Sequence, residues 1–288
     1  MGSARANTPG AGAGGARVVV VTGAGHGIGR AVALRLAEER CLLVLADIDR
    51  KAVDTLAAAL GDRHMAAPLD VTCAAAVQDL ARDVRDRFGR LDVWINNAGL
   101  LPQGLLMEQG LSVLEATWEV NVAGVLHGCR AALGVMLPQR SGHIVNIASV
   151  CALRPLPGLA LYSATKAAVR ALSHALRREV SGHGIGVSAV LPHLTTTRAS
   201  AGLRRPRMFP ALRPAQVADA VAAVLHRPCA QRVVPRRLGW LLAGAEMCPE
   251  RVRDTAEAWL GADRTSLGAD RAARTSYEAE LPGGAHHD

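Results

Sequence analysis

One tyrosine and one lysine stand four residues apart, in a segment that reads Tyr-Ser-Ala-Thr-Lys from Tyr162 to Lys166. The chain has only two tyrosines and two lysines among its 288 residues, and arginine accounts for 31 of its 33 basic side chains. Residues four apart on a helix share one face, so both side chains can point into the same cleft. A nearby cation lowers the pKa of a phenol toward neutral pH. The pair is therefore predicted to act as an acid/base device.

Lysine suits such a site better than arginine does. Its compact ammonium can approach a ring and also donate to a ribose hydroxyl, whereas the arginine fork favours carboxylates and phosphates. The alternative is a helix that carries Tyr162 and Lys166 by coincidence, because unrelated helices contain the same spacing. The motifs elsewhere in the chain decide between these interpretations.

Apolar runs and helical patterns alternate along the chain and predict the elements that hold these residues. The expected strands are 17–22, 42–46, a run ending at 69, 93–95, 143–148 and 186–191, with a last edge strand at 232–235. The expected helices are 50–60, 74–87, 112–137 ending at Pro138, 160–181 and one that begins near Pro214. A string of βα units predicts an α/β fold with a doubly wound parallel sheet of the Rossmann type.

Length and composition agree with a single domain. Half of the residues are apolar and 3% are aromatic, which suits buried parallel strands flanked by closely packed helices. Residues 17–261 are expected to form this domain, including a short C-terminal helical extension. Residues 1–16 and 262–288 are expected to be flexible tails.

The charge and hydropathy patterns exclude some classes of protein. The formal net charge is +8, but the arginines are scattered over the expected helices without interleaved aromatic residues, so no nucleic-acid partner is expected. The first sixteen residues lack the apolar core of a secretion signal, and no later run reaches roughly 18 apolar residues. We therefore expect a cytoplasmic protein without an integral membrane segment.

The cysteines do not form a recognisable metal or disulfide pattern. They stand at positions 41, 73, 129, 151, 229 and 248, with no CxxC pair and no zinc-type spacing to histidine. Buried, reduced thiols and no metal site are expected.

A glycine-rich segment directly follows the first expected strand. It reads Thr22, Gly23, Ala24, Gly25, His26, Gly27, Ile28, Gly29. This pattern predicts a strand, then a glycine turn, then a helix. Glycines let the backbone approach a pyrophosphate at the N-terminus of a helix. A tight connection without a ligand is the alternative. All of these residues except Ala24 are candidate cofactor contacts.

An acidic residue, Asp47, ends the second expected strand. A carboxylate there can accept hydrogen bonds from both hydroxyls of an adenosine ribose, and it repels a 2′-phosphate. The sequence therefore favours NAD, with NADP as the second option because a protonated His26 would weaken the preference. The alternative is that Asp47 only caps the next helix.

Two further motifs follow the third and fourth expected strands. Asp70 and Val71 come after the third, and Asn96-Asn97-Ala98-Gly99 comes after the fourth. The small residues of the tetrapeptide let the chain pass beside a cofactor, and its asparagines can satisfy backbone groups at strand ends. An ordinary Asn/Gly turn would explain the composition of this motif but not its placement.

These motifs, from Thr22 to about Thr197, resemble those of the short-chain dehydrogenase/reductase family in its compact single-domain branch. The glycine segment matches the family's TGxxxGxG loop, and the tetrapeptide matches its NNAG motif. The resemblance implies that the cofactor contacts also include Asp70, Val71, Asn97, Ala98, Gly99, Tyr162 and Lys166.

The resemblance also implies a catalytic tetrad of Asn121, Ser149, Tyr162 and Lys166. Asn121 lies within the expected 112–137 helix, where it would hold a water that links Lys166 to solvent. A buried asparagine that satisfies a helix kink is the alternative. Ser149 ends a strand thirteen residues before Tyr162 and would orient the substrate oxygen.

The last motif departs from the family pattern. Relatives read Pro-Gly followed by a small or branched residue and threonine, whereas this chain continues from Pro192 with His193. Pro192, Thr195 and Thr197 are still implied to contact the nicotinamide and pyrophosphate. His193 adopts a positive φ less freely than glycine, so a different local backbone is expected. We favour a structural or solvent-facing role for His193 over a catalytic one.

The implied function is hydride transfer between NAD(H) and an alcohol or ketone. An apolar rim is expected beside the cleft, and it favours a hydrophobic secondary alcohol. The leucines of this rim would equally suit packing against a loop. The rim consists of Leu153, Pro155, Leu156, Pro157 and Leu159, together with a 194–212 stretch that contains Arg204, Arg205, Arg207, Met208 and Phe209. One alternative is an NAD(P)-binding sensor or scaffold without chemistry. Another is a nucleotide-sugar epimerase or dehydratase, although these usually carry a larger substrate domain.

The segment 236–244 and the amphipathic pattern that follows it to Leu260 extend past the usual end of the family. Its basic and aromatic residues suit a membrane surface or a lipid-like substrate. Packing on the same domain or across a subunit interface is favoured instead. The resemblance implies a homodimer or homotetramer built through the helix that carries Tyr162 and Lys166.

Overall fold

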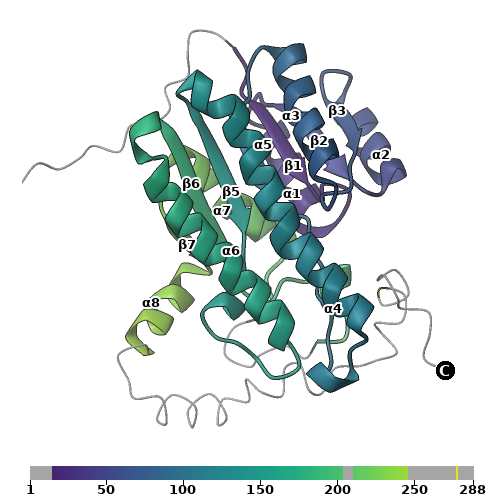
Figure 1. Ribbon diagram of the computed structural model, residues 1–288, viewed down its shortest axis with the longest axis vertical. Helices are drawn as coiled ribbons and strands as arrows, with labels where there is room; N and C mark the ends of the chain where they lie inside the picture. The colour runs from purple at the N-terminus through teal and green to yellow at the C-terminus, as the bar shows by residue number, and fades with distance from the viewer. Residues whose placement is uncertain (1–14, 204–209, 246–276, 278–288) are drawn as a thin grey trace, which may run out of the picture.

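The computed structural model describes residues 15–203, 210–245 and Tyr277. In this part of the chain, parallel strands form one seven-stranded sheet in the order β3-β2-β1-β4-β5-β6-β7 (Figure 1). The strands are β1 (Val18–Thr22), β2 (Leu42–Asp47), β3 (Met65–Pro68), β4 (Val93–Asn96), β5 (Gly142–Ile147), β6 (Ile185–Pro192) and β7 (Gln231–Val234). The α-helices are α1 (Gly27–Ala37), α2 (Arg50–Leu60), α3 (Ala74–Phe88), α4 (Leu111–Trp118), α5 (Gly124–Gln139), α6 (Ala160–Glu179), α7 (Pro214–His226) and α8 (Arg236–Ala245).

Strand β1 shows why helices cover both faces of the sheet. All of its residues are buried, and successive side chains point to opposite faces. Val18 and Val20 join a core formed with α3, α5 and α6, whereas Val19 and Val21 join a core formed with α1, α2 and α7. A strand buried on both faces reads as a continuous apolar run, which is the pattern in the sequence. The prediction of a doubly wound sheet is confirmed.

The strand order reverses between β1 and β4. Strand β1 pairs with β2 on one side and with β4 on the other, and all of these pairings are parallel. Ligands of such sheets bind outside the carboxyl ends of the strands at this reversal. Thr22 and Asn96, which end β1 and β4, therefore mark the place where the predicted motifs should meet.

The long helix predicted over 112–137 is wrong in two details. The structure has α4, then a π-helical turn from Glu119 to Ala123, then α5. A π turn widens the helix by one residue and frequently marks a functional site. Pro138 also lies inside the last turn of α5, which ends at Gln139, and Arg140, the next residue, adopts the left-handed conformation.

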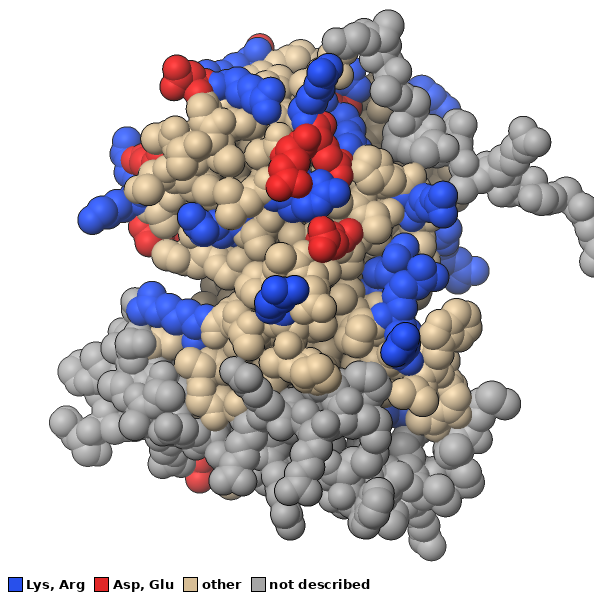
Figure 2. Space-filling model, turned by 180° about the vertical axis from the view of Figure 1, so that it is seen from behind, with Lys and Arg blue, Asp and Glu red and all other residues tan. Residues whose placement is uncertain are grey.

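The same helical stretch bears on the membrane expectation. By length and composition alone, Leu111–Gln139 is apolar enough to cross a membrane, although it contains no uninterrupted run of 18 apolar residues. Half of its most apolar part is buried inside the protein. On the face shown in Figure 2, acidic side chains lie among the basic ones, and no continuous basic stripe is formed.

The C-terminal extension begins as predicted. Strand β7 lies at the edge of the sheet, and α8 packs against it at Gly239, where a Cβ would lie 3.1 Å from Val233 Cβ. Trp240 and Leu241 of α8 are 76% and 56% exposed, so this helix packs on its own domain through one side only. The stretch from 246 to 260 and most of both predicted tails lie outside the described residues.

The cysteines of the described residues are free thiols. Cys41 and Cys129 are buried, and burial raises the pKa of the Cys129 thiol to about 12. The expectation of burial is wrong for Cys73, which is exposed because it stands at the N-cap of α3. Cys248 lies outside the described residues. No three His, Cys, Asp or Glu side chains gather as a metal site in the described part of the chain.

Candidate active site

The loop after β1 leaves no room for side chains at its glycines. A Cβ on Gly29 would lie 2.0 Å from the carbonyl oxygen of Gly23, and a Cβ on Gly23 would lie 2.8 Å from Ala98 Cα. Helix α1 then begins at Gly27 without a side-chain cap from His26 and without an acidic residue in its first turn. The first N–H groups of α1 are thus left for an anion, as the motif predicts.

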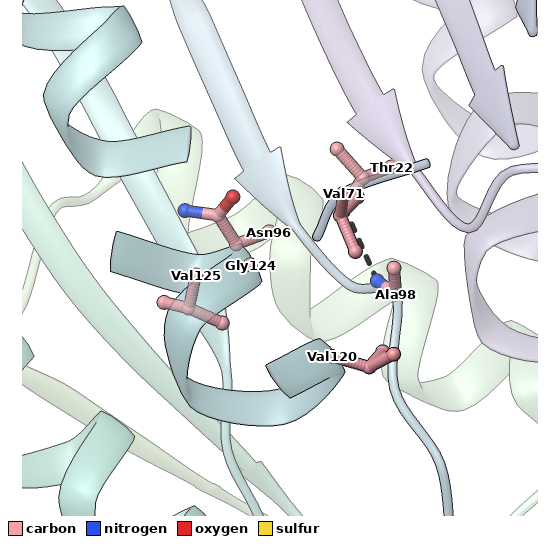
Figure 3. A pocket seen from close by; sticks show the side chains of 7 residues that line it. All are labelled: Thr22, Val71, Asn96, Ala98, Val120, Gly124 and Val125. Atoms are coloured by element: carbon pink, nitrogen blue, oxygen red, sulfur yellow. Dashed lines mark hydrogen bonds between the residues drawn. The ribbon is translucent and has the colours of Figure 1, made fainter. Parts of the chain in front are cut away.

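The ends of β1 and β4 are joined by hydrogen bonds. The Asn97 amide donates to the carbonyl oxygens of Thr22 and Gly23 at 2.9 and 3.1 Å, and Thr22 Oγ1 accepts from the backbone N–H groups of Asn97 and Ala98. Figure 3 shows Ala98 beside Thr22 in a hollow at this edge, lined by Thr22, Val71, Asn96, Ala98, Val120, Gly124 and Val125. Three predicted cofactor contacts thus lie around one hollow, which does not include Tyr162 or Lys166.

Asp47 is bound to the glycine loop. Its Oδ2 accepts from the backbone N–H of Gly25 at 2.8 Å, and its Oδ1 accepts from that of Asp49 at 3.0 Å. The cap of α2 is Asp49, which accepts from Ala52 N. The alternative that Asp47 caps this helix is therefore wrong. His26 also contacts Asp49, with Nε2 at 2.9 Å from Oδ2.

Asp70 and Val71 take different places after β3. Asp70 is exposed, and its Oδ1 accepts from both the backbone N–H and the hydroxyl of Thr72. Val71 is buried, and its carbonyl oxygen lies 3.1 Å from Nδ1 of His127. Val71 is thus the member of the predicted pair that lines the hollow of Figure 3.

The π turn places Asn121 against the chain that leaves β4. Its Oδ1 accepts from Leu100 N at 2.7 Å, and its Nδ2 donates to Leu100 O at 2.9 Å and to Thr165 Oγ1 at 3.1 Å. A Cβ on Gly99 would lie 3.0 Å from Asn121 Oδ1 and 3.3 Å from Lys166 Nζ. Gly99 is therefore the small residue that lets the asparagine and the lysine approach each other.

Ser149, Tyr162 and Lys166 meet between the end of β5 and the start of α6. Lys166 Nζ lies 5.7 Å from the centre of the Tyr162 ring and donates to Ile147 O at 3.1 Å. Ser149 is buried, accepts from Cys151 N at 3.2 Å and is close enough to the Tyr162 phenol to lower its pKa. The structure thus brings the four predicted catalytic residues together at one edge of the sheet.

Burial controls the ionisation of this pair. It raises the pKa of Tyr162, with a further rise from the nearby Cys151 and Tyr277, while Ser149 acts in the opposite direction. Burial also lowers the pKa of Lys166 to about 8. In the protein alone, desolvation is the largest influence on the pKa of Tyr162 and raises it, opposite to the lowering that we expect from Lys166.

The motif after β6 closes toward the glycine loop. Pro192 ends the strand, and Thr195 is buried with its hydroxyl donating to His193 O at 2.9 Å. The methyl group of Thr197 would lie 3.3 Å from a Cβ on Gly27. The backbone N–H of His193 donates to Val234 O at 2.8 Å, and His193 has no positive φ. The chain at His193 therefore avoids the left-handed conformation that glycine would allow.

Two of the predicted rim residues belong to the core. Leu159 is buried and Leu153 packs against the core cluster, whereas Pro155 and Pro157 are exposed. The packing alternative therefore applies to both of these leucines. Residues 204–209, with the other predicted rim residues from Arg204 to Phe209, lie outside the described residues.

Three residues at this site were missed by the motif analysis. Thr165 binds Asn121, Cys151 is close to Tyr162 and Lys166, and Tyr277 acts on Tyr162 from the far end of the chain. The scarcity of tyrosine was a signal that pointed to Tyr277, since both tyrosines of the chain lie here.

Comparisons with known proteins agree with this geometry. The family model for short chain dehydrogenase matches residues 17–207. This chain belongs to the short-chain dehydrogenase/reductase family. It is 35% identical over 213 residues to an uncharacterised oxidoreductase of Staphylococcus aureus (strain USA300), covering 74% of this chain and 92% of that protein. An uncharacterised oxidoreductase of Staphylococcus epidermidis is 32% identical over 215 residues, with the same coverage.

Solved structures of short-chain dehydrogenases and reductases have a similar fold. A short-chain dehydrogenase/reductase from Burkholderia phymatum, in complex with NAD, gives a TM-score of 0.73 at 28% identity and covers 80% of this chain and 92% of its own. The 3-ketoacyl-(acyl-carrier-protein) reductase from Brucella melitensis, complexed with NADH, gives 0.69 at 28% identity and covers 77% and 98%. The family and the Rossmann-type fold are thus established together.

Proposed function

We propose that this protein is an NAD-dependent oxidoreductase that interconverts an apolar secondary alcohol and its ketone. The observation that carries the proposal is the meeting of Ser149, Tyr162 and Lys166 at the edge where the glycine loop and Asp47 lie. The bound NAD and NADH of the two solved relatives support the choice of cofactor.

The residues at the strand ends fit a dinucleotide. The uncapped N-terminus of α1 and its glycines suit the pyrophosphate, and Asp47 is placed on the neighbouring strand for the adenosine ribose. A 2′-phosphate would lie against the Asp47 carboxylate, so NAD is preferred over NADP. The cofactor, when bound, accepts or supplies the hydride.

Tyr162 exchanges the proton with the substrate oxygen. Its raised pKa keeps the phenol protonated at neutral pH, which is the form that donates when a ketone is reduced. Ser149 binds the same oxygen, because its hydroxyl already lies within hydrogen-bond reach of the phenol. For alcohol oxidation the phenol must lose its proton, and the nearby Lys166 ammonium stabilises the resulting charge.

Asn121 extends this arrangement away from the substrate. It fixes the Leu100 peptide and lies next to Lys166 across Gly99. We assign it the role of holding a water that exchanges protons between Lys166 and solvent. This role, like those of the other three residues, rests on the family resemblance together with the distances given above.

The apolar class of substrate is proposed from the surface beside the cleft. Leu105, Leu106 and Met107 are 49%, 52% and 94% exposed and directly follow the loop that Asn121 holds. Exposed apolar side chains that gather in this way mark a binding surface. A cytoplasmic location and a homo-oligomer built through α6 complete the proposal.

Turnover with a substrate panel tests the proposal. The purified protein is assayed with NAD and with NADP against hydrophobic secondary alcohols, and in reverse against ketones including a 3-ketoacyl thioester, by the absorbance of reduced nicotinamide. We expect turnover of apolar members with a preference for NAD. Cofactor binding without turnover of any member would favour a sensor or scaffold. Nucleotide sugars are incubated separately and their products analysed, because epimerisation and dehydration leave the amount of reduced nicotinamide unchanged; conversion of a sugar alone would favour an epimerase or dehydratase.

A further inference from the structure

The second tyrosine of the chain lies at the catalytic site. The hydroxyl oxygen of Tyr277 accepts a hydrogen bond from the backbone N–H of Leu101 at 2.9 Å. Tyr277 is partly buried, and it contributes to the rise in the pKa of Tyr162, so the two phenols are within electrostatic reach. Both tyrosines of a 288-residue chain thus lie near each other.

Tyr277 contacts the loop that follows β4 and contains Leu100 and Leu101. Asn121 binds the N–H and the carbonyl of Leu100. Tyr277 binds the next N–H along the chain, and Gly104 N donates to Gly158 O in the segment that leads into α6. The loop is thus held by the π turn, by the segment before Tyr162 and by Tyr277.

We propose that Tyr277 is a positioning and specificity-determining residue of this active site. Its hydroxyl fixes the Leu101 peptide, and its ring forms one wall of the space that a substrate bound at Tyr162 and Ser149 must enter. A phenol suits both tasks because it combines a rigid apolar ring with a polar end. The proposal rests on the proposed function, since a substrate is needed for the wall to select among substrates.

The position of Tyr277 can be tested without turnover. Tyrosine labelled with ¹³C at Cζ gives two signals in this chain, which Tyr162→Phe and Tyr277→Phe assign by the loss of one signal each. We expect Tyr277→Phe to shift the Tyr162 signal and Tyr162→Phe to shift the Tyr277 signal. Trp240→Phe, at an exposed aromatic residue of α8, is the matched control and should move neither signal. Unshifted signals in both tyrosine variants would overturn the proposal.

The role of Tyr277 is tested by kinetics on the best substrate of the panel. Loss of one hydrogen bond predicts that Tyr277→Phe raises KM about 3- to 10-fold and leaves kcat and the Kd for NADH nearly unchanged. Tyr277→Ala removes the wall and should shift the preference toward substrates that are bulkier beyond the carbinol carbon. Unchanged KM and unchanged preference, in a wild-type enzyme that turns over, would overturn the role. If the wild type turns over nothing, the proposed function fails, and the two labelled signals still decide whether Tyr277 lies at Tyr162.

Discussion

Tyr162 and Lys166 respond to burial in opposite directions. Desolvation favours the neutral form of each group, so the phenol holds its proton more firmly while the ammonium releases its proton at about pH 8. The four-residue spacing was enough to predict that both side chains share a cleft. The spacing does not reveal how deeply each group is buried. Burial is what raises the pKa of the phenol.

Asp47 offers a test of cofactor choice at a single carboxylate. Asp47→Ser removes the charge that we propose to bind the adenosine ribose, so the ratio of kcat/KM for NADP over NAD should rise by about tenfold or more, equivalent to about 1.4 kcal/mol. Asp54→Ser, at an exposed acidic residue of α2, is the control and should leave the ratio unchanged. An unchanged ratio in the Asp47 variant would show that this carboxylate does not select the cofactor.

At the scale of elements, the π turn is the feature that periodicity could not predict. The apolar pattern of 112–137 fits one continuous helix, and asparagine at 121 was the only sign of an interruption. The turn is held by three hydrogen bonds that join the Asn121 side chain to Leu100 and Thr165, which are distant in sequence. Such contacts form only once β4 and α6 have docked, so a local pattern carries no trace of them.

Two glycines of α5 should respond oppositely to the same substitution. A Cβ on Gly128 would lie 2.0 Å from Asn96 Oδ1 and 2.6 Å from Trp94 Nε1, which are bonded to each other, whereas a Cβ on Gly134 would meet nothing within 4 Å. Gly128→Ala should therefore lower the free energy of unfolding by about 1–3 kcal/mol. Gly134→Ala should raise it by about 0.5–1 kcal/mol, because alanine is the better helix former.

Denaturant unfolding of both variants beside the wild type measures these changes. Equal destabilisation by the two substitutions would mean that the close packing of α5 on β4 is not as described.

At the scale of the whole molecule, the order of strands and helices followed from the alternation of apolar runs and helical patterns. The strand that precedes each motif and the edge at which the motifs meet were predicted because parallel βα units place all carboxyl ends together. The position of Tyr277 was not predicted, and its segment was expected to be a flexible tail. A contact between Leu101 and a residue 176 positions further along the chain leaves no periodic signal in the sequence.

Acid should destabilise the fold through His143, which is buried in the inner strand β5. Burial lowers the pKa of this imidazole to about 4, and its Nε2 lies 2.9 Å from Ser188 Oγ. Because the unfolded chain binds the proton near pH 6.5, stability is complete above that pH and falls as the pH drops toward 4. Between pH 7 and pH 5 the wild type should lose about 2 kcal/mol more than His143→Val does.

Urea unfolding at both pH values gives this difference. The exposed His183→Gln variant is the control and should lose as much stability as the wild type. An equal loss in wild type and His143→Val would contradict the assignment of the acid sensitivity to His143.

The central claim is that Tyr162 exchanges the proton while hydride passes to or from NAD. The most direct test is the turnover number of Tyr162→Phe with the best substrate of the panel, measured together with the Kd for NADH. The account predicts a loss in kcat of at least about 10²-fold with the Kd for NADH nearly unchanged. Turnover within a few-fold of the wild type would contradict the claim, because no proton would then need to come from this phenol.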